Sequence, residues 1–262
     1  MKYQLTRWIL LAIVLAMAIG CAGNLEHRKR QSQATRDVGE AYMVQGNFTA
    51  ALNELLKAEK IYPDDPILQD YLGLAYRAKD HFTEAEAHFK KALALKPEYA
   101  VAYNNLGETY LTQKKWDAAI AVFKELSANI LYSTPHFADL NLAWAYYNKH
   151  DYATATVYYK KVIKHYLDGF ARDIVYVKAL RGMGKIYLAS GKLDKAGKIM
   201  EEALSLAPDF PPLLMDVAKT RDALGKTESA VAAYHKVIEV APGSRLAAEA
   251  IKALSALTPS SN

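Results

Sequence analysis

Residues 66–99, PILQDYLGLAYRAKDHFTEAEAHFKKALALKPEY, carry the pattern that decides the fold of this chain. Their small, aromatic and proline residues stand 34 positions after the same residue types in the preceding segment. The matching pairs are Gly39 and Gly73, Tyr42 and Tyr76, Ala51 and Ala85, Ala58 and Ala92, and Pro63 and Pro97. Each period contains two amphipathic runs, so the sequence predicts stacked pairs of helices, A and B, that repeat along the chain.

This spacing resembles the tetratricopeptide repeat, in which a small residue at position 8 of helix A lets helix B approach closely. An aromatic residue at position 11 fills the gap, alanines at positions 20 and 27 are contacts of helix B, and a proline at position 32 ends it. On this register six repeats begin at Ser32, Pro66, Ala100, His136, Val177 and Pro211. Departures from the pattern include Leu126 in place of an alanine and the missing proline in repeat 3, and Arg221 in place of the aromatic residue in repeat 6.

We therefore predict an all-α fold over residues 32–257, a right-handed superhelical solenoid of about six tetratricopeptide repeats plus a C-terminal capping helix. The cap is expected over residues 244–257, with Ser244 as its N-cap, because a repeat array must cover its last apolar face. Residues 258–262 are expected to be a disordered tail. Two insertions interrupt the period, two residues near 128–135 and seven near 164–170, and insertions of this kind often lie on a binding face.

The N-terminus has the features of a signal peptide over residues 1–20. Lys2 and Arg7 precede an apolar run from Trp8 to Ile19, which is too short to span a bilayer as a helix. Residues 18–21, Ala-Ile-Gly-Cys, resemble a bacterial lipobox with alanine in place of the usual leucine, so Cys21 is expected to carry lipid. The alternative is that Cys21, the single cysteine of the chain, is an incidental apolar residue in an uncleaved anchor.

The residues after the cysteine indicate where the protein is expected to reside. Ala22 stands where an aspartate usually retains Gram-negative lipoproteins at the inner membrane, so the pattern favours the periplasmic face of the outer membrane. Residues 21–31 are expected to form a lipidated polar tether whose basic cluster at 27–30 could touch anionic headgroups or be solvated.

Composition argues against nucleic acid as a partner and against catalysis. Loss of Lys2 and Arg7 with the signal peptide lowers the formal net charge from +5 to +3, and the remaining basic residues form no dense stripe. The seven histidines are scattered, and His81 and His88 lack a convincing third metal ligand. We expect no enzyme activity, no metal and no cofactor.

Positions 2, 5, 9 and 12 of helix A usually line the concave groove of such repeats. In repeat 4 they are Phe137, Leu140, Trp144 and Tyr147. In repeat 5 the cations Lys178, Arg181 and Lys185 occupy the first three, and in repeat 3 Asn104 and Glu108 occupy the middle two. An aromatic patch beside three cations would suit a peptide with hydrophobic anchors and acidic residues. The alternative is that Trp144 and Tyr147 pack under the neighbouring insertion.

The lysine–asparagine clamp of cytosolic chaperone adaptors, which binds a C-terminal carboxylate, is absent. Position 5 of the six repeats reads Arg36, Asp70, Asn104, Leu140, Arg181 and Met215. Capture of a C-terminal carboxylate by that clamp is therefore not expected.

A lipobox, a short polar tether and six repeats together resemble the PilF/PilW family of type IV pilus biogenesis lipoproteins over essentially the whole mature chain. The stretch 126–135, with a Leu-Tyr step before the Asn-Leu-Ala of residues 141–143, adds to the likeness, although Ala143 replaces the family's glycine. The resemblance implies a pilotin, which binds a secretin subunit and aids its localisation and assembly at the outer membrane. Phe137, Leu140, Trp144 and Tyr147 would then be the apolar part of the site, with Arg181 and Lys185 as its polar rim.

Two other functions remain open from the sequence. The chain could be a scaffold lipoprotein of another envelope machine, serving polysaccharide export, peptidoglycan hydrolase control or outer-membrane protein assembly. It could also be an accessory or carrier that holds a small ligand within the superhelix. A protein partner, a secretin or another envelope-complex subunit, remains the expectation.

Overall fold

The computed structural model describes residues 24–129, 132–169 and 172–257. The signal peptide, Cys21 and the expected C-terminal tail lie outside these residues, so those expectations stay predictions. The chain divides between Lys114 and Lys115 into two compact units, which we describe separately.

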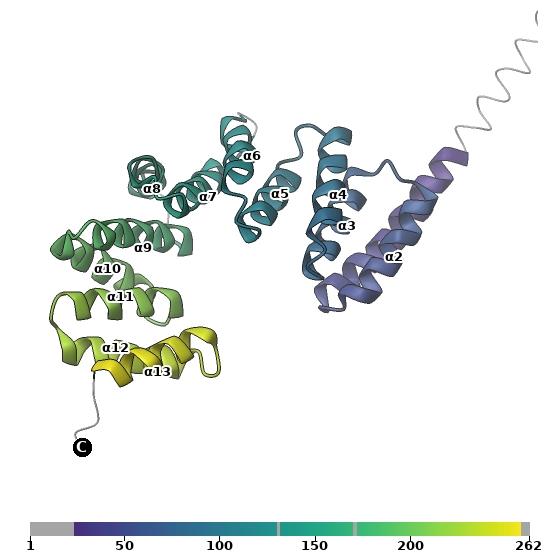
Figure 1. The fold of residues 1–262 in the computed structure, drawn as a ribbon. Helices are drawn as coiled ribbons and strands as arrows, with labels where there is room; N and C mark the ends of the chain where they lie inside the picture. The colour runs from purple at the N-terminus through teal and green to yellow at the C-terminus, as the bar shows by residue number, and fades with distance from the viewer. Residues whose placement is uncertain (1–23, 130–131, 170–171, 258–262) are drawn as a thin grey trace, which may run out of the picture. The chain divides into compact units, whose positions relative to one another are not determined.

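All regular structure in the described ranges is helical, which confirms the expected all-α repeat fold (Figure 1). A helix over residues 24–44 is followed, in the N-terminal unit, by α2 (Phe48–Ile61), α3 (Pro66–Ala78), α4 (Phe82–Leu95) and α5 (Ala100–Thr112). The C-terminal unit contains α6 (Trp116–Ala128), α7 (Pro135–Asn148), α8 (Tyr152–Leu167), α9 (Ile174–Ala189), α10 (Leu193–Leu206), α11 (Pro211–Ala223), α12 (Thr227–Val240) and α13 (Arg245–Leu257). No helix within these ranges combines the length and apolarity needed to cross a membrane.

The helices pair as the repeat register predicts. Helix α3 packs on α4, α7 on α8, α9 on α10 and α11 on α12, and each pair also contacts the next helix along the chain within its unit. The helix B alanines of the register are fully buried, among them Ala58, Ala85 and Ala203. Position 8 requires a small residue because a Cβ on Gly73 would lie 2.5 Å from the Phe89 ring.

The turn between the two helices of each repeat contains one residue in the left-handed region, always at position 15. Glycine occupies it at Gly46, Gly191 and Gly225, with φ between 69° and 73°. The middle repeats use Asp80, Lys114 and His150 instead, with φ between 58° and 62°. Side chains are strained in this region, and aspartate and histidine tolerate it better than most residues.

The described part of the expected tether, residues 24–31, is helical. Residues 24–31 continue without a break into helix A of the first repeat, and their side chains are mostly exposed. Arg28 donates to the Ile61 carbonyl from Nε at 2.9 Å, and Ser32 Oγ donates to the Ala58 carbonyl at 2.8 Å. Ile61 is the last residue of α2, where carbonyls lack helical partners, whereas the Ala58 carbonyl also accepts from the Tyr62 amide at 3.0 Å. The two side-chain bonds hold the N-terminal helix against α2.

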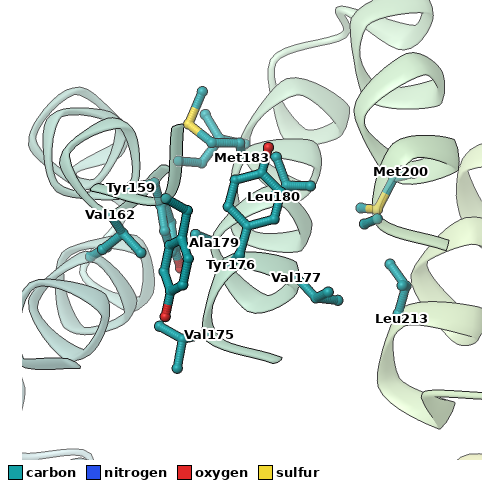
Figure 2. Packing of buried hydrophobic residues seen from close by; sticks show 14 of the residues in the cluster. Tyr159, Val162, Val175, Tyr176, Val177, Ala179, Leu180, Met183, Met200 and Leu213 are labelled. Atoms are coloured by element: carbon teal, nitrogen blue, oxygen red, sulfur yellow. The ribbon is translucent and has the colours of Figure 1, made fainter. Parts of the chain in front are cut away.

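The C-terminal unit has a core that is centred on helix α9. Val175, Tyr176, Leu180 and Met183 are nearly inaccessible and meet side chains of α8, among them Tyr159 (Figure 2). The core continues through Val177 of α9 to Met200 and Leu213 of the next two helices. This core holds the adjacent A helices α7, α9 and α11 in fixed register.

The capping helix is present as expected. Helix α13 spans Arg245–Leu257 and packs on α12 and α11, with Ala247 and Ala250 buried. Ser244 Oγ accepts a hydrogen bond from the Ala247 amide at 3.1 Å, which confirms it as the N-cap.

Candidate functional site

Helices α7, α9 and α11 place the predicted residues of repeats 4 and 5 on adjacent surfaces of the C-terminal unit. Pro135 begins α7, and the Asp173 carboxylate caps α9 by accepting from the Val175 amide at 2.7 Å. Spacings of three and four residues then bring side chains to one side of each helix. We call the resulting surface the α7–α9–α11 face.

The aromatic part of this face is an ordered stack. The rings of Trp144 and Tyr147 are nearly parallel, with centroids 5.9 Å apart and an interplanar angle of 14°. Tyr152, from the start of α8, lies against Tyr147 at 5.5 Å. Phe137 is 40% exposed at the other end of α7, and Leu140 lies between, partly buried.

Lys185 of α9 lies over both rings of the stack. Its Nζ is 4.9 Å from the Trp144 ring centroid and 4.6 Å from that of Tyr147, which are cation–π distances. Burial lowers the pKa of Lys185, and nearby Arg181 and Lys219 act in the same direction while Asp216 opposes them. The aromatic surface therefore carries its own cation.

Arg181 is held by helix α11. Its Nε donates to Asp216 Oδ2 at 2.6 Å and to the Pro212 carbonyl at 3.2 Å. The Asp216 carboxylate, which is only 9% exposed as a residue, offsets the arginine charge. Arg181 lines the site but is only partly exposed, whereas Lys178 is exposed. Lys178 is therefore the more accessible of these two cations.

A pocket of about 180 Å³ opens between the aromatic stack and the cations. It is lined by Leu140, Asn141, Trp144, Tyr159, Lys178, Arg181 and Gly182. Gly182 is needed for its shape, because a Cβ there would lie 2.2 Å from Cζ of Tyr159. A volume of this size admits one side chain, apolar on the α7 side and polar on the α9 side.

The second insertion does not cover Trp144 and Tyr147 with its described residues. It lengthens α8 and α9 instead, and its side chains gather at the other end of α7. His165 stacks on His136 at 4.2 Å, and Tyr166 meets His136 edge-on at 5.6 Å. Trp144 and Tyr147 are both partly exposed, and Tyr152 and Lys185 lie against the stack that they form.

The remaining predicted residues, Asn104 and Glu108, belong to the N-terminal unit. Both lie on α5, where Asn104 Nδ2 donates to Glu108 Oε1 at 3.0 Å. Arg77 of α3 donates to the other carboxylate oxygen of Glu108 at 3.1 Å. Asn104, Glu108 and Arg77 therefore form a separate polar cluster within the N-terminal unit.

The histidines considered as metal ligands have other roles. His88 Nδ1 lies 2.7 Å from Gln69 Oε1, and its ring stacks on Tyr76 at 5.2 Å. The described residues contain no group of three histidine, cysteine or carboxylate side chains arranged to hold a metal ion.

Sequence reasoning missed Asp216, the anion that fixes Arg181. Arg181 is position 5 of its repeat and Asp216 is position 6 of the next. Asp70 and Asn105 hold the same two positions at the junction of repeats 2 and 3 and also bond to each other, at 2.9 Å. Complementary polar residues 35 positions apart in the sequence could therefore have predicted the bond between Arg181 and Asp216.

Comparisons with known proteins agree with the repeat assignment. One tetratricopeptide repeat model matches residues 76–130 and 187–257, and a second matches residues 137–166. The sequence matched none of the curated proteins searched.

Solved structures show the same fold at low identity. A crystal structure of PilW, titled a widely conserved type IV pilus biogenesis factor, aligns with a TM-score of 0.70 and 19% identity over 84% of this chain and 98% of that one. The structure of PilF of Pseudomonas aeruginosa aligns with a TM-score of 0.68 and 19% identity, over 87% of this chain and 99% of that one. The structure of a tetratricopeptide repeat protein of Parabacteroides merdae aligns with a TM-score of 0.71 and 17% identity, over 87% of this chain and 86% of that one. The two tetratricopeptide repeat models together match more than half of the chain, so the chain belongs to the tetratricopeptide-repeat family.

Proposed function

We propose that this protein is a lipid-anchored adaptor of type IV pilus biogenesis. In this proposal its α7–α9–α11 face binds a secretin subunit, and the lipid on Cys21 holds the complex at the periplasmic face of the outer membrane. The repeat fold, which generally mediates protein binding, and the likeness to PilW and PilF support this assignment. So do the signal peptide and lipobox-like sequence of residues 1–21.

The single observation that carries the binding assignment is the composition of the face itself. An aromatic stack, a pocket for one side chain and four cations, Lys178, Arg181, Lys185 and Lys219, oppose one carboxylate, that of Asp216. Such a surface suits a peptide that places an apolar side chain in the pocket and carboxylates beside it. Aromatic residues and arginine are the residue types that most often dominate binding energy at interfaces.

The first test replaces the apolar wall of the pocket. Trp144→Ala combined with Leu140→Ala is expected to prevent recovery of a secretin with the protein from detergent-solubilised envelope and to reduce secretin multimers. The matched control is Val157→Ala combined with Ile251→Ala, which removes two apolar side chains that are 64% and 56% exposed elsewhere in the same unit. Circular dichroism checks that each variant is folded.

The outcomes distinguish the levels of the proposal. Unchanged secretin recovery with the folded double variant would show that the binding site is elsewhere. Recovery of polysaccharide-export or peptidoglycan-hydrolase proteins without a secretin would support the adaptor role but contradict the assignment to type IV pilus biogenesis.

The lipid anchor needs a test of its own. Cys21→Ser is expected to move the protein from the membrane fraction to the soluble periplasmic fraction, because several acyl chains are needed for stable anchoring. A Cys21→Ser variant that stays in the outer membrane would contradict lipidation as the means of attachment.

A further inference from the structure

The junctions between consecutive repeats follow a packing rule. Position 11 of helix A faces positions 21 and 25 of the preceding helix B. At the junction of repeats 1 and 2, Tyr76 packs in one cluster with Leu52 and Leu56. At the junction of repeats 3 and 4, Lys124 at position 25 lies over the Tyr146 ring at 5.7 Å. Repeats 1 to 5 all have tyrosine at position 11, so at these junctions the chain fills the space with its own aromatic ring.

The junction of repeats 5 and 6 breaks this rule at all three positions. Position 21 is Gly197, position 25 is Glu201, and position 11 of repeat 6 is Arg221. No other junction in the array has glycine at position 21 or lacks tyrosine at position 11. Leu224 fills part of this space, because its Cδ1 lies 3.1 Å from where a Cβ on Gly197 would stand, but no tyrosine ring from position 11 fills the rest.

A cleft of about 870 Å³ occupies this space. Its apolar walls include Met200, Val217 and Leu224, and Thr220 and Gly197 also line it. Charged residues complete the lining: Asp194, Lys198, Glu201, Arg221 and Lys226. The cleft is separate from the pocket of the α7–α9–α11 face, with which it shares no lining residue.

Arg221 is fixed in a defined orientation inside the cleft. Its Nε and Nη2 donate to the two carboxylate oxygens of Glu201 at 3.0 and 3.1 Å, a bidentate pair. Its Nη1 donates to the Ser229 carbonyl at 3.1 Å. The Arg221 side chain is still 22% exposed, and a guanidinium held by its edge in this way can stack a flat face on an aromatic ring.

The rim of the cleft has an excess of free positive charge. Glu201 offsets Arg221, which leaves Lys198 and Lys226 against Asp194. Within the described part of the chain, neither lysine ammonium group has an ion-pair or hydrogen-bond partner. A carboxylate that enters beside the ring would therefore find two cations at the rim.

We propose that this cleft is a second protein-binding site, which takes an aromatic side chain of a partner with a carboxylate next to it. The partner ring would enter the cleft beside Arg221 and stack on its guanidinium group, with Met200 in the cleft wall. The site is independent of the secretin-binding face, so it can engage a different segment or a different partner.

The test uses the methyl signal of Met200, one of six methionines, as a reporter in the full protein labelled with [¹³C-methyl]methionine. The probe is the peptide acetyl-Asp-Tyr-Asp-amide, titrated into the millimolar range. Ring-current shifts are expected at Met200, with saturation, and not at Met43 in the N-terminal unit. Acetyl-Asp-Ala-Asp-amide, which lacks the ring, is expected to leave the Met200 signal in place.

Three variants separate the cleft from a general effect. Arg221→Tyr restores the residue of the other junctions and is expected to abolish the peptide-induced shift while the melting temperature stays at or above that of the parent. Lys198→Glu is expected to raise the peptide Kd about fivefold, as for loss of an exposed charge pair. Lys195→Glu makes the same charge change on an exposed position of the same helix outside the cleft, and it should leave the Kd unchanged.

The proposal fails if Met200 does not respond to the tyrosine peptide. It also fails if Arg221→Tyr binds that peptide as the parent does, or if Lys195→Glu and Lys198→Glu weaken binding equally. None of these results depends on secretin recovery, so failure here leaves the proposed function standing.

Discussion

Replacing Asp70 by asparagine is expected to stabilise the N-terminal unit more at pH 8 than at pH 4. Asp70 lies on α3 and is only 3% exposed. Both of its carboxylate oxygens accept from Nδ2 of Asn105, at 2.9 and 3.1 Å. Burial nevertheless dominates and raises the pKa of Asp70 from 3.8 to about 6, against the hydrogen bond from Asn105 and the charge of Arg77.

The direction of the pH dependence follows from the raised pKa. The folded state binds the Asp70 proton more tightly than the unfolded state, so this group favours folding fully below its unfolded pKa of about 4. That contribution is lost as the pH rises through about 6, the folded value. A shift of about two pKa units corresponds to about 3 kcal/mol, of which about 2 kcal/mol falls between pH 4 and pH 8.

The assay is urea unfolding of the parent and of Asp70→Asn at both pH values, followed by circular dichroism. The quantity compared is the stability difference between variant and parent at pH 8 minus that at pH 4, in which the other titrating groups cancel. Asn105→Ala supplies the opposite perturbation, because loss of its hydrogen bonds raises the pKa of Asp70 further and steepens the pH dependence. Equal stability differences at the two pH values would refute the argument that burial raises the pKa of Asp70.

Three further substitutions test individual contacts, each by thermal or urea unfolding. Gly182→Ala is expected to destabilise the C-terminal unit by about 2 kcal/mol, because its Cβ would overlap Tyr159; an unchanged midpoint would mean that the ring can move away. Arg181→Ala should cost about 2 kcal/mol by leaving the carboxylate of Asp216 buried without its partner, and Asp216→Asn in the same background should recover part of that loss. Ser244→Ala should cost about 1 kcal/mol through loss of the α13 N-cap, and Ser244→Asp, which can also cap, should not.

Most of the fold follows from the spacing of a few residue types. Position 8 must be small where Phe89 crosses Gly73, and a helix B alanine must be small where helices meet, so the register can be read from the chain. The helix over residues 24–31 could not be read in this way. It has no apolar stripe, and it is held by bonds from Arg28 and Ser32 to carbonyls that only the packed structure brings within reach.

The residues of the candidate site were predictable, but their relations to one another were not. The repeat register gives the side of the helix on which Trp144, Arg181 and Lys185 lie. It does not show that Lys185 extends over the aromatic rings or that Arg181 turns toward Asp216, because these choices depend on side-chain torsions and on the neighbouring repeat. The sequence showed that Arg221 departs from the repeat pattern. It did not predict the cleft, because the cleft also depends on Gly197 at the same junction.

The left-handed residue in each helix turn has a consequence for how the array comes apart. Gly46, Gly191 and Gly225 adopt that conformation freely, while Asp80, Lys114 and His150 each hold it at a cost of about 1 kcal/mol. In a linear array, where each repeat contacts only its neighbours, such costs stay local instead of spreading through one common core. The turns at Asp80, Lys114 and His150 are therefore expected to open in hydrogen exchange and proteolysis sooner than the turns that contain glycine, and glycine substitutions at these three residues should slow that opening.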